Sequence, residues 1–243
     1  MLDRLRTLSE SSDFADHYGT FFPDLKPFAA FTLGLCRGQT LAHSGVPLRA
    51  FYLIESGAFK AVRLGSDGQS QIMAFYFPRE VMGLSAFAEQ AYVSDLIALT
   101  PSVVHAIPAS VLHHSPQPAQ ELLGIFVHLL SEQLARAEQD KLMLGVCSGT
   151  QKIASFLLDL QEKIRRADAD PSCFDLPMTR QEIGSYLGMT MESISRLLSL
   201  LQEQDIVQVN KRHIRILRED QLRLWRDDGF DKAFSSRRQQ RRA

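Results

Sequence analysis

Residues 179–202, TRQEIGSYLGMTMESISRLLSLLQ, limit the fold more than any other part of this chain. Apolar residues recur at steps of three and four on both sides of Gly188, the spacing of one face of an α-helix. Thr179, followed three residues later by Glu182, predicts a capping box at the start of the first helix, and Thr190 predicts the start of the second. Two short helices joined at a glycine turn predict a helix-turn-helix.

The second helix is expected to bury one face and to present the other to a ligand. The buried face is predicted to hold Ile194, Leu197, Leu198 and Leu201. The opposite face carries Glu192, Ser195 and Arg196 within the first two turns. Arginine can donate two hydrogen bonds to guanine, glutamate can accept one from cytosine, and serine can do either, so this face fits base edges. An ordinary solvated helix face can show the same three residues, and that alternative stays open on the triad alone.

Residues 206–217, IVQVNKRHIRIL, predict a β-hairpin with a basic tip directly after the two helices. The stretch 176–218 holds six Lys or Arg and four Asp or Glu residues, so its net charge is +2 in a chain of net charge −1. A helix-turn-helix followed by such a hairpin is a winged unit. Its phosphate contacts are predicted to come from the two helix starts and the hairpin tip, namely from Thr179, Arg180, Thr190, Ser193, Lys211 and Arg212.

The rest of the chain divides into parts of different texture. Residues 1–115 are predicted to form an N-terminal β-roll, because short β-prone runs alternate with glycine and proline at 51–56, 58–64, 71–77 and 102–107. Residues 116–147 are predicted to form one long helix, and residues 148–225 the winged unit. Within that unit, 167–174 is expected to be a polar loop. Residues 226–243 are expected to be a disordered basic tail. The arginines of that tail either contact phosphate or stay solvated. The fold class is therefore α+β.

The long helix carries a heptad repeat that predicts dimerisation. Steps of four and three alternate along Leu123, Val127, Leu130, Leu134, Ala137, Lys141 and Leu144. This spacing is typical of two helices that pack lengthwise, so a homodimer is expected, with Lys141 helping to specify the register. A helix that simply lies on its own β-domain remains the alternative.

Composition limits the remaining classes of function. The chain has 243 residues, of which 45% are hydrophobic, and a net charge of −1, so it has the size of about two soluble domains and is not a general nucleic-acid coat. Three separated cysteines, no apolar leader and no long apolar run favour the cytoplasm and no membrane span. No catalytic or metal-binding residues are predicted, since an enzyme on a cupin-like roll needs a cluster that is not found among the scattered His43, Glu55, Glu80, Glu89 and His105.

The motif MTRQEIGSYLGMTMESISRLLSLLQ resembles the CRP/FNR superfamily of bacterial transcription regulators, and the resemblance extends over about residues 20–225. Glycines match the family's turn positions at Gly38, Gly45, Gly57, Gly68 and Gly83. The resemblance implies a cyclic-nucleotide-binding-like jelly roll, a dimerisation helix and a homodimer that binds double-stranded DNA, with RNA polymerase as a partner if the protein is an activator. The E-x-x-S-R pattern at Glu192, Ser195 and Arg196 implies an inverted repeat of TTGAT-like half-sites. Met191, where the CRP branch carries arginine, favours the FNR branch.

Two of the family's ligands are not expected here. An FNR-type iron–sulfur cluster needs four cysteines, whereas the first 35 residues contain none and His105 takes the motif position of the fourth. Cyclic AMP is also not expected, because Leu84 and Val93 stand where the nucleotide binders of this family carry glutamate and arginine.

The signal is therefore left open between three alternatives. Haem could be held by one of the histidines, with His43, His105, His113 and His114 as candidates. Thiol oxidation could act at Cys36, Cys147 or Cys173, of which Cys147 is the best placed, between the long helix and the winged unit. Control through synthesis alone would need no ligand. Two other functions also remain: a protein-interaction module, or a constitutive DNA binder with a vestigial sensor domain.

Overall fold

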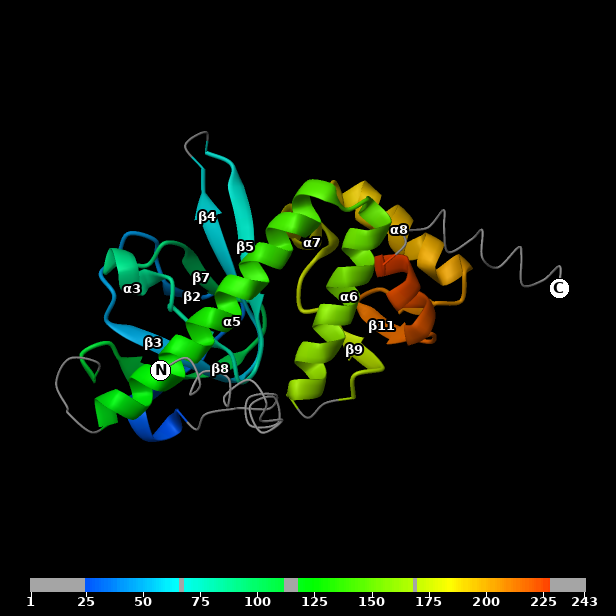
Figure 1. Cartoon of the computed structure of the whole chain (residues 1–243). Helices are drawn as coiled ribbons and strands as arrows, with labels where there is room; N and C mark the ends of the chain where they lie inside the picture. The colour runs from blue at the N-terminus through cyan, green and yellow to red at the C-terminus, as the bar shows by residue number, and fades with distance from the viewer. Residues whose placement is uncertain (1–24, 66–67, 112–117, 168–169, 228–243) are drawn as a thin grey trace, which may run out of the picture.

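The computed structural model describes residues 25–65, 68–111, 118–167 and 170–227. A β-roll, a long helix that crosses it, and a smaller unit of helices with a short sheet follow one another along the chain (Figure 1). This arrangement confirms the predicted α+β fold. The segments 1–24 and 228–243 lie outside the described residues, and with them most of the basic tail.

The described part of the roll contains two four-stranded antiparallel sheets, ordered β1-β8-β3-β6 and β2-β7-β4-β5. Its elements are η1 (Lys26–Phe28), β1 (Phe31–Leu35), β2 (Thr40–Ala42), β3 (Ala50–Ser56), β4 (Phe59–Leu64), β5 (Ser70–Tyr76), β6 (Val81–Met82), α3 (Ala86–Glu89), β7 (Asp95–Ala98) and β8 (Ser102–Pro108). The four runs predicted from the sequence are β3, β4, β5 and β8. The five glycines of the family's turn positions all have positive φ, which is a backbone conformation that favours glycine.

Strand β3 is buried on both faces, which explains its continuous apolar sequence. Tyr52 and Ile54 belong to the core inside the roll, whereas Phe51 and Leu53 belong to a second cluster that contains the first turns of α5 (Pro118–Val146). Phe51 packs edge-on against Phe126 of α5, with ring centroids 4.6 Å apart. This packing fixes the long helix on the roll.

The winged unit follows α5 directly. It contains α6 (Gly149–Arg166), β9 (Cys173–Asp175), α7 (Arg180–Leu187), α8 (Met191–Glu203), β10 (Val207–Asn210), β11 (His213–Ile216) and a final helical segment, 219–227. The predicted hairpin is confirmed as β10 and β11. The expectation of a loop over 167–174 is wrong at its end, because β9 begins at Cys173 and pairs with β11. This strand has only three residues, of which Phe174 alone is buried. So short a segment cannot show the alternation of apolar and polar residues by which a strand is recognised in a sequence.

One apolar cluster runs from the roll into the winged unit. Ile72, Phe75 and Phe77 of the roll pack in the same cluster as the buried residues of α6, α7 and α8. Phe75 lies against Phe156 of α6, with centroids 6.2 Å apart. The roll and the winged unit therefore share a core. Among the described residues, no helix is both long and apolar enough to cross a membrane.

Candidate DNA-binding surface

Helix α8 separates its apolar and polar residues as the sequence predicts. Ile194, Leu198 and Leu201 are buried, and Leu197 is partly buried against the same core. The helix begins at Thr190, whose hydroxyl accepts a hydrogen bond of 3.2 Å from the amide of Ser193. On the other side, Glu192 and Arg196 are exposed and Ser195 is half-buried. The three predicted base-reading residues thus lie together on the outer face of this helix.

Helix α7 is held at both ends by local interactions. Thr179 and Glu182 form the predicted capping box, with bonds of 3.2 Å from the Glu182 amide to the Thr179 hydroxyl and 2.6 Å from the Thr179 amide to the Glu182 carboxylate. The helix ends at Gly188, whose φ of 64° is left-handed. A Cβ on Gly184 would lie 2.5 Å from the Met189 carbonyl oxygen, so only glycine lets the turn approach α7 this closely.

Arg180 connects the two helices across this turn. Its guanidinium donates a 3.2 Å hydrogen bond to the hydroxyl of Ser195. Arg180 is predicted to contact phosphate and Ser195 to contact bases, and the structure brings the two side chains together. A positive group therefore lies directly beside the exposed face of α8, where it can orient the serine hydroxyl.

The wing presents one exposed cation at its tip. Lys211 is exposed and has a φ of 56°, a left-handed conformation that the tight turn between β10 and β11 imposes. Arg212 is half-buried and donates a 3.4 Å hydrogen bond to the Pro177 carbonyl, while its own carbonyl accepts one of 2.8 Å from the Leu176 amide. Of the two predicted wing residues, Lys211 thus points outward and Arg212 also holds the wing to the segment before α7.

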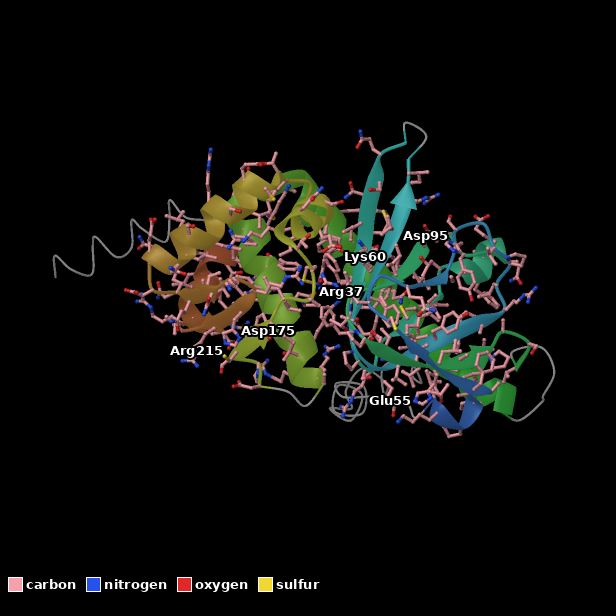
Figure 2. All side chains as sticks on the ribbon, turned by 180° about the vertical axis from the view of Figure 1, so that it is seen from behind. Arg37, Glu55, Lys60, Asp95, Asp175 and Arg215 are labelled. Carbon is pink, nitrogen blue, oxygen red and sulfur yellow. The ribbon has the colours of Figure 1, made fainter. Side chains whose placement is uncertain are left out.

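Helix α7 also binds the β-roll, a contact that the sequence analysis did not predict. Lys60 of β4 forms a 2.7 Å ion pair with Glu182, and Figure 2 shows Lys60 on the side of the roll that faces the winged unit. The Ile72 amide donates a 3.1 Å hydrogen bond to the Ser185 hydroxyl, and the Gln71 side chain donates to the Ser185 carbonyl. The first helix of the helix-turn-helix is therefore positioned by the hairpin β4–β5.

Two acids at this contact have shifted pKa values. Burial opposes ionisation of Glu182, but the hydrogen bonds from Lys60 and from the Thr179 amide outweigh it, and the pKa of Glu182 is lowered. Burial raises the pKa of Asp140, although the Tyr186 hydroxyl donates to its two oxygens at 3.1 and 3.2 Å. These interactions join α7 to the roll on one side and to α5 on the other.

The predicted dimer seam is uncovered in the single chain. All seven of its residues are exposed, whereas the opposite side of α5 buries Leu122, Ile125 and Phe126 against the roll. Packing of α5 on its own roll explains why this second side is buried. It does not explain why the seam residues, most of them apolar, are exposed. The exposed stripe comprises Leu123, Val127, Leu130, Leu134, Ala137, Lys141 and Leu144.

Comparison with known proteins agrees with this geometry. Residues 33–114 match the cyclic nucleotide-binding domain, and residues 151–225 match the Crp-like helix-turn-helix domain. Over 181 residues the chain is 33% identical to the transcriptional regulatory protein btr of Bordetella pertussis, which covers 74% of this chain and 75% of that relative. The chain belongs to the CRP/FNR family of transcription regulators.

Other CRP/FNR proteins match over similar lengths. The fumarate and nitrate reduction regulatory protein of Vibrio cholerae is 32% identical over 186 residues, covering 76% of this chain and 74% of that protein. The solved structure of FixK2 from Bradyrhizobium japonicum superposes with a TM-score of 0.73 at 27% identity, covering 79% of this chain and 95% of that one. Matches of this extent include the roll, the long helix and the winged unit.

Leu84 and Val93 are the two positions of the roll on which the expectation of no cyclic nucleotide rests, and both are apolar. Leu84 is buried in the apolar cluster between the roll and α5, so it offers no partner to a ribose. Val93 offers none to a phosphate. Inside the roll, Tyr52 and Tyr92 stack with centroids 6.3 Å apart, and the Tyr92 hydroxyl donates a 2.6 Å hydrogen bond to the Ala50 carbonyl. That the roll binds no cyclic nucleotide stays a prediction from the sequence.

The candidate sensing residues lie apart from one another. His105 is largely buried between Thr32, at 3.0 Å, and Glu55, at 3.1 Å, while His43 is exposed beside Asp95. Two further candidates, His113 and His114, lie outside the described residues. Within the described ranges, no group of three or more His, Cys, Asp or Glu residues is placed to hold a metal ion.

Proposed function

We propose that this regulator binds, as a homodimer, an inverted repeat of TTGAT-like half-sites in double-stranded DNA. The observation that carries the proposal is the outer face of α8, where Glu192, Ser195 and Arg196 lie together opposite the buried stripe. The first turns of such a helix enter the major groove. Arg196 then donates to guanine and Glu192 accepts from cytosine, while Arg180 orients Ser195.

The uncovered stripe on α5 supports the dimer. Seven exposed positions at heptad spacing leave apolar surface in water unless a second copy covers it. Packing two copies of α5 lengthwise relates the two winged units by a twofold axis. Two α8 helices can then enter successive major grooves, which requires half-sites about one helical turn apart.

The contacts between the roll and α7 support control by the sensor domain. A change in the roll that moves the hairpin β4–β5 also moves α7, through Lys60 and Ser185, and with it the turn and α8. The signal then shifts the population between dimers that match and mismatch two grooves. We expect no cyclic nucleotide, because Leu84 and Val93 offer no charged partner, and no four-thiolate cluster, because the chain has three cysteines. Haem bound by His105 or His43 is one candidate signal. It would give a Soret band in the optical spectrum of protein purified without air.

DNA binding is measured by fluorescence anisotropy with labelled duplexes at fixed salt. We expect Arg196→Ala to weaken binding to the TTGAT repeat by about 1–3 kcal/mol and to change binding to a random duplex much less. Arg223→Ala, which removes an arginine from the final helical segment, is the matched control and should bind as the unmodified protein does. Equal weakening on both duplexes would show that Arg196 holds phosphate and does not read bases.

The dimer is measured by analytical ultracentrifugation. Leu134 and Leu142 are both 63% exposed on α5, but only Leu134 lies on the heptad seam. We expect Leu134→Asp to give monomers and Leu142→Asp to leave dimers. If both variants stayed dimeric, the copies would meet through another surface. Contacts to RNA polymerase, which we propose for an activator in the cytoplasm, need transcription assays with the purified polymerase.

A further inference from the structure

The outer face of the small sheet carries a cluster of reactive and charged side chains. In the pairing of β9 with β11, His213 lies opposite Asp175 and Arg215 lies opposite Cys173. Side chains alternate between the two faces of a sheet, so these four share one face. The residues between them, Phe174 and Ile214, point into the core and are buried. Figure 2 shows Asp175 and Arg215 at this sheet, away from the β-roll.

His213 joins the cysteine to the carboxylate. Its Nε2 lies 3.0 Å from the Cys173 sulfur, and its Nδ1 lies 2.9 Å from an oxygen of Asp175. A protonated imidazole donates from both nitrogens, so it can bind a thiolate on one side and a carboxylate on the other. The sulfur of Cys173 and the carboxylate of Asp175 therefore lie on opposite sides of the imidazole ring. They do not converge on one point where they could bind a metal ion together.

This order of groups is the one that activates a cysteine nucleophile. As the thiol attacks, its proton can pass to Nε2 of the imidazole, and the carboxylate orients the ring for that transfer. Cys173 is half-buried, and its neighbours His213 and Asp175 have side chains that are 48% and 78% exposed, so the cluster lies at the surface. Within the described residues, neither Cys36 nor Cys147 has its sulfur paired with a histidine.

We propose that Cys173 is a modification site that reacts with low-molecular-weight disulfides bearing carboxylates. The thiolate attacks one sulfur of the disulfide, the sulfur–sulfur bond breaks, and a mixed disulfide forms on Cys173. The leaving thiolate takes the proton from Nε2 of His213 and departs as a thiol, so the exchange needs no other oxidant. Arg215, which lies opposite Cys173 in the pairing, supplies a cation for the carboxylate of the incoming molecule.

The first test compares the cysteines within one molecule. The full chain is treated with oxidised glutathione at pH 7, quenched with acid at intervals, and mapped by peptide mass spectrometry. Cys173 is expected to gain the glutathionyl group about tenfold faster than Cys36, although Cys36 is the more exposed of the two. A Cys36 that reacts as fast as Cys173 would overturn the proposal.

The second test removes the partners of the thiol. His213→Gln should slow the reaction of Cys173 about tenfold and Asp175→Asn should slow it by a smaller factor, while Cys36 in the same samples keeps its rate and controls for folding. An unchanged Cys173 rate in His213→Gln would show that the contact is structural only. Arg215→Gln should slow oxidised glutathione but not 2,2′-dithiodipyridine, which carries no carboxylate. If both reagents were slowed equally, Arg215 would not be the group that binds the carboxylate of the incoming disulfide.

Discussion

The ion pair between Lys60 and Glu182 should contribute measurably to the stability of the winged unit. The two side chains are 21% and 19% exposed, and their nitrogen and oxygen lie 2.7 Å apart. At this distance and an effective dielectric constant of about 20, Coulomb's law gives an attraction of about 6 kcal/mol. Desolvation and lost side-chain freedom offset most of this, so a coupling free energy of about 1–2 kcal/mol is expected, above the value for exposed pairs.

A double-mutant cycle with Lys60→Met and Glu182→Gln isolates this coupling. Met keeps the apolar stem of Lys60, and Gln keeps an oxygen that can accept the hydrogen bond from the Thr179 amide. Unfolding in urea is followed by the fluorescence of Trp225, which is the only tryptophan of the chain and lies 3% exposed in the core of the winged unit. The change in unfolding free energy therefore reports on the winged unit itself.

The coupling should also depend on pH in a defined direction. Because the pKa of Glu182 is lowered by folding, the ion pair stabilises the protein fully above the unfolded pKa, near 4.5, and its contribution is lost as the pH falls through the folded pKa. At pH 7 the cycle should give the full coupling. A coupling below about 0.3 kcal/mol at pH 7 would refute the reasoning, since it would equal that of a weak exposed pair.

Three further predictions concern single positions. Gly184→Ala should destabilise the winged unit by about 1–2 kcal/mol in the same urea assay, because the clash with the Met189 carbonyl exceeds the gain in helix propensity. Lys211→Ala should weaken the binding of all duplexes alike and reduce the slope of log affinity against log salt by about one, measured by anisotropy. Asp140→Asn should leave thermal stability at pH 7 unchanged or raised, because burial disfavours the charged carboxylate and Asn still accepts the hydrogen bond from Tyr186.

The helix-turn-helix and the hairpin after it could be predicted from the sequence because local interactions determine them. A capping box needs only Thr179 and Glu182 three residues apart, and the buried stripe of α8 follows from helical spacing. The strands β1, β2, β6 and β7 carried weaker signals, since they have two to five residues each. Short strands are recognised by their partners, which the linear sequence does not reveal.

The contacts that position α7 against the roll could not be predicted. Lys60 and Glu182 are 122 residues apart, and each has an ordinary local role, one on a strand and the other in a capping box. The same applies to Cys173 and His213, which are 40 residues apart and meet only because β9 pairs with β11. The sequence favours Cys147 as the redox-active cysteine because of its position between two helices. In the structure, it is Cys173 whose sulfur contacts a histidine.

The core shared by the roll and the winged unit has a consequence for dissecting this regulator. In a fragment that begins at residue 148, the rings of Phe156 and Tyr186 would become more exposed to solvent, because Phe75 of the missing roll packs against both. Such a fragment loses part of its own interior, and its affinity for DNA would reflect that damage as well as the absence of the roll. Point substitutions in β5 are therefore a cleaner way than truncation to separate the contribution of the roll from that of the winged unit.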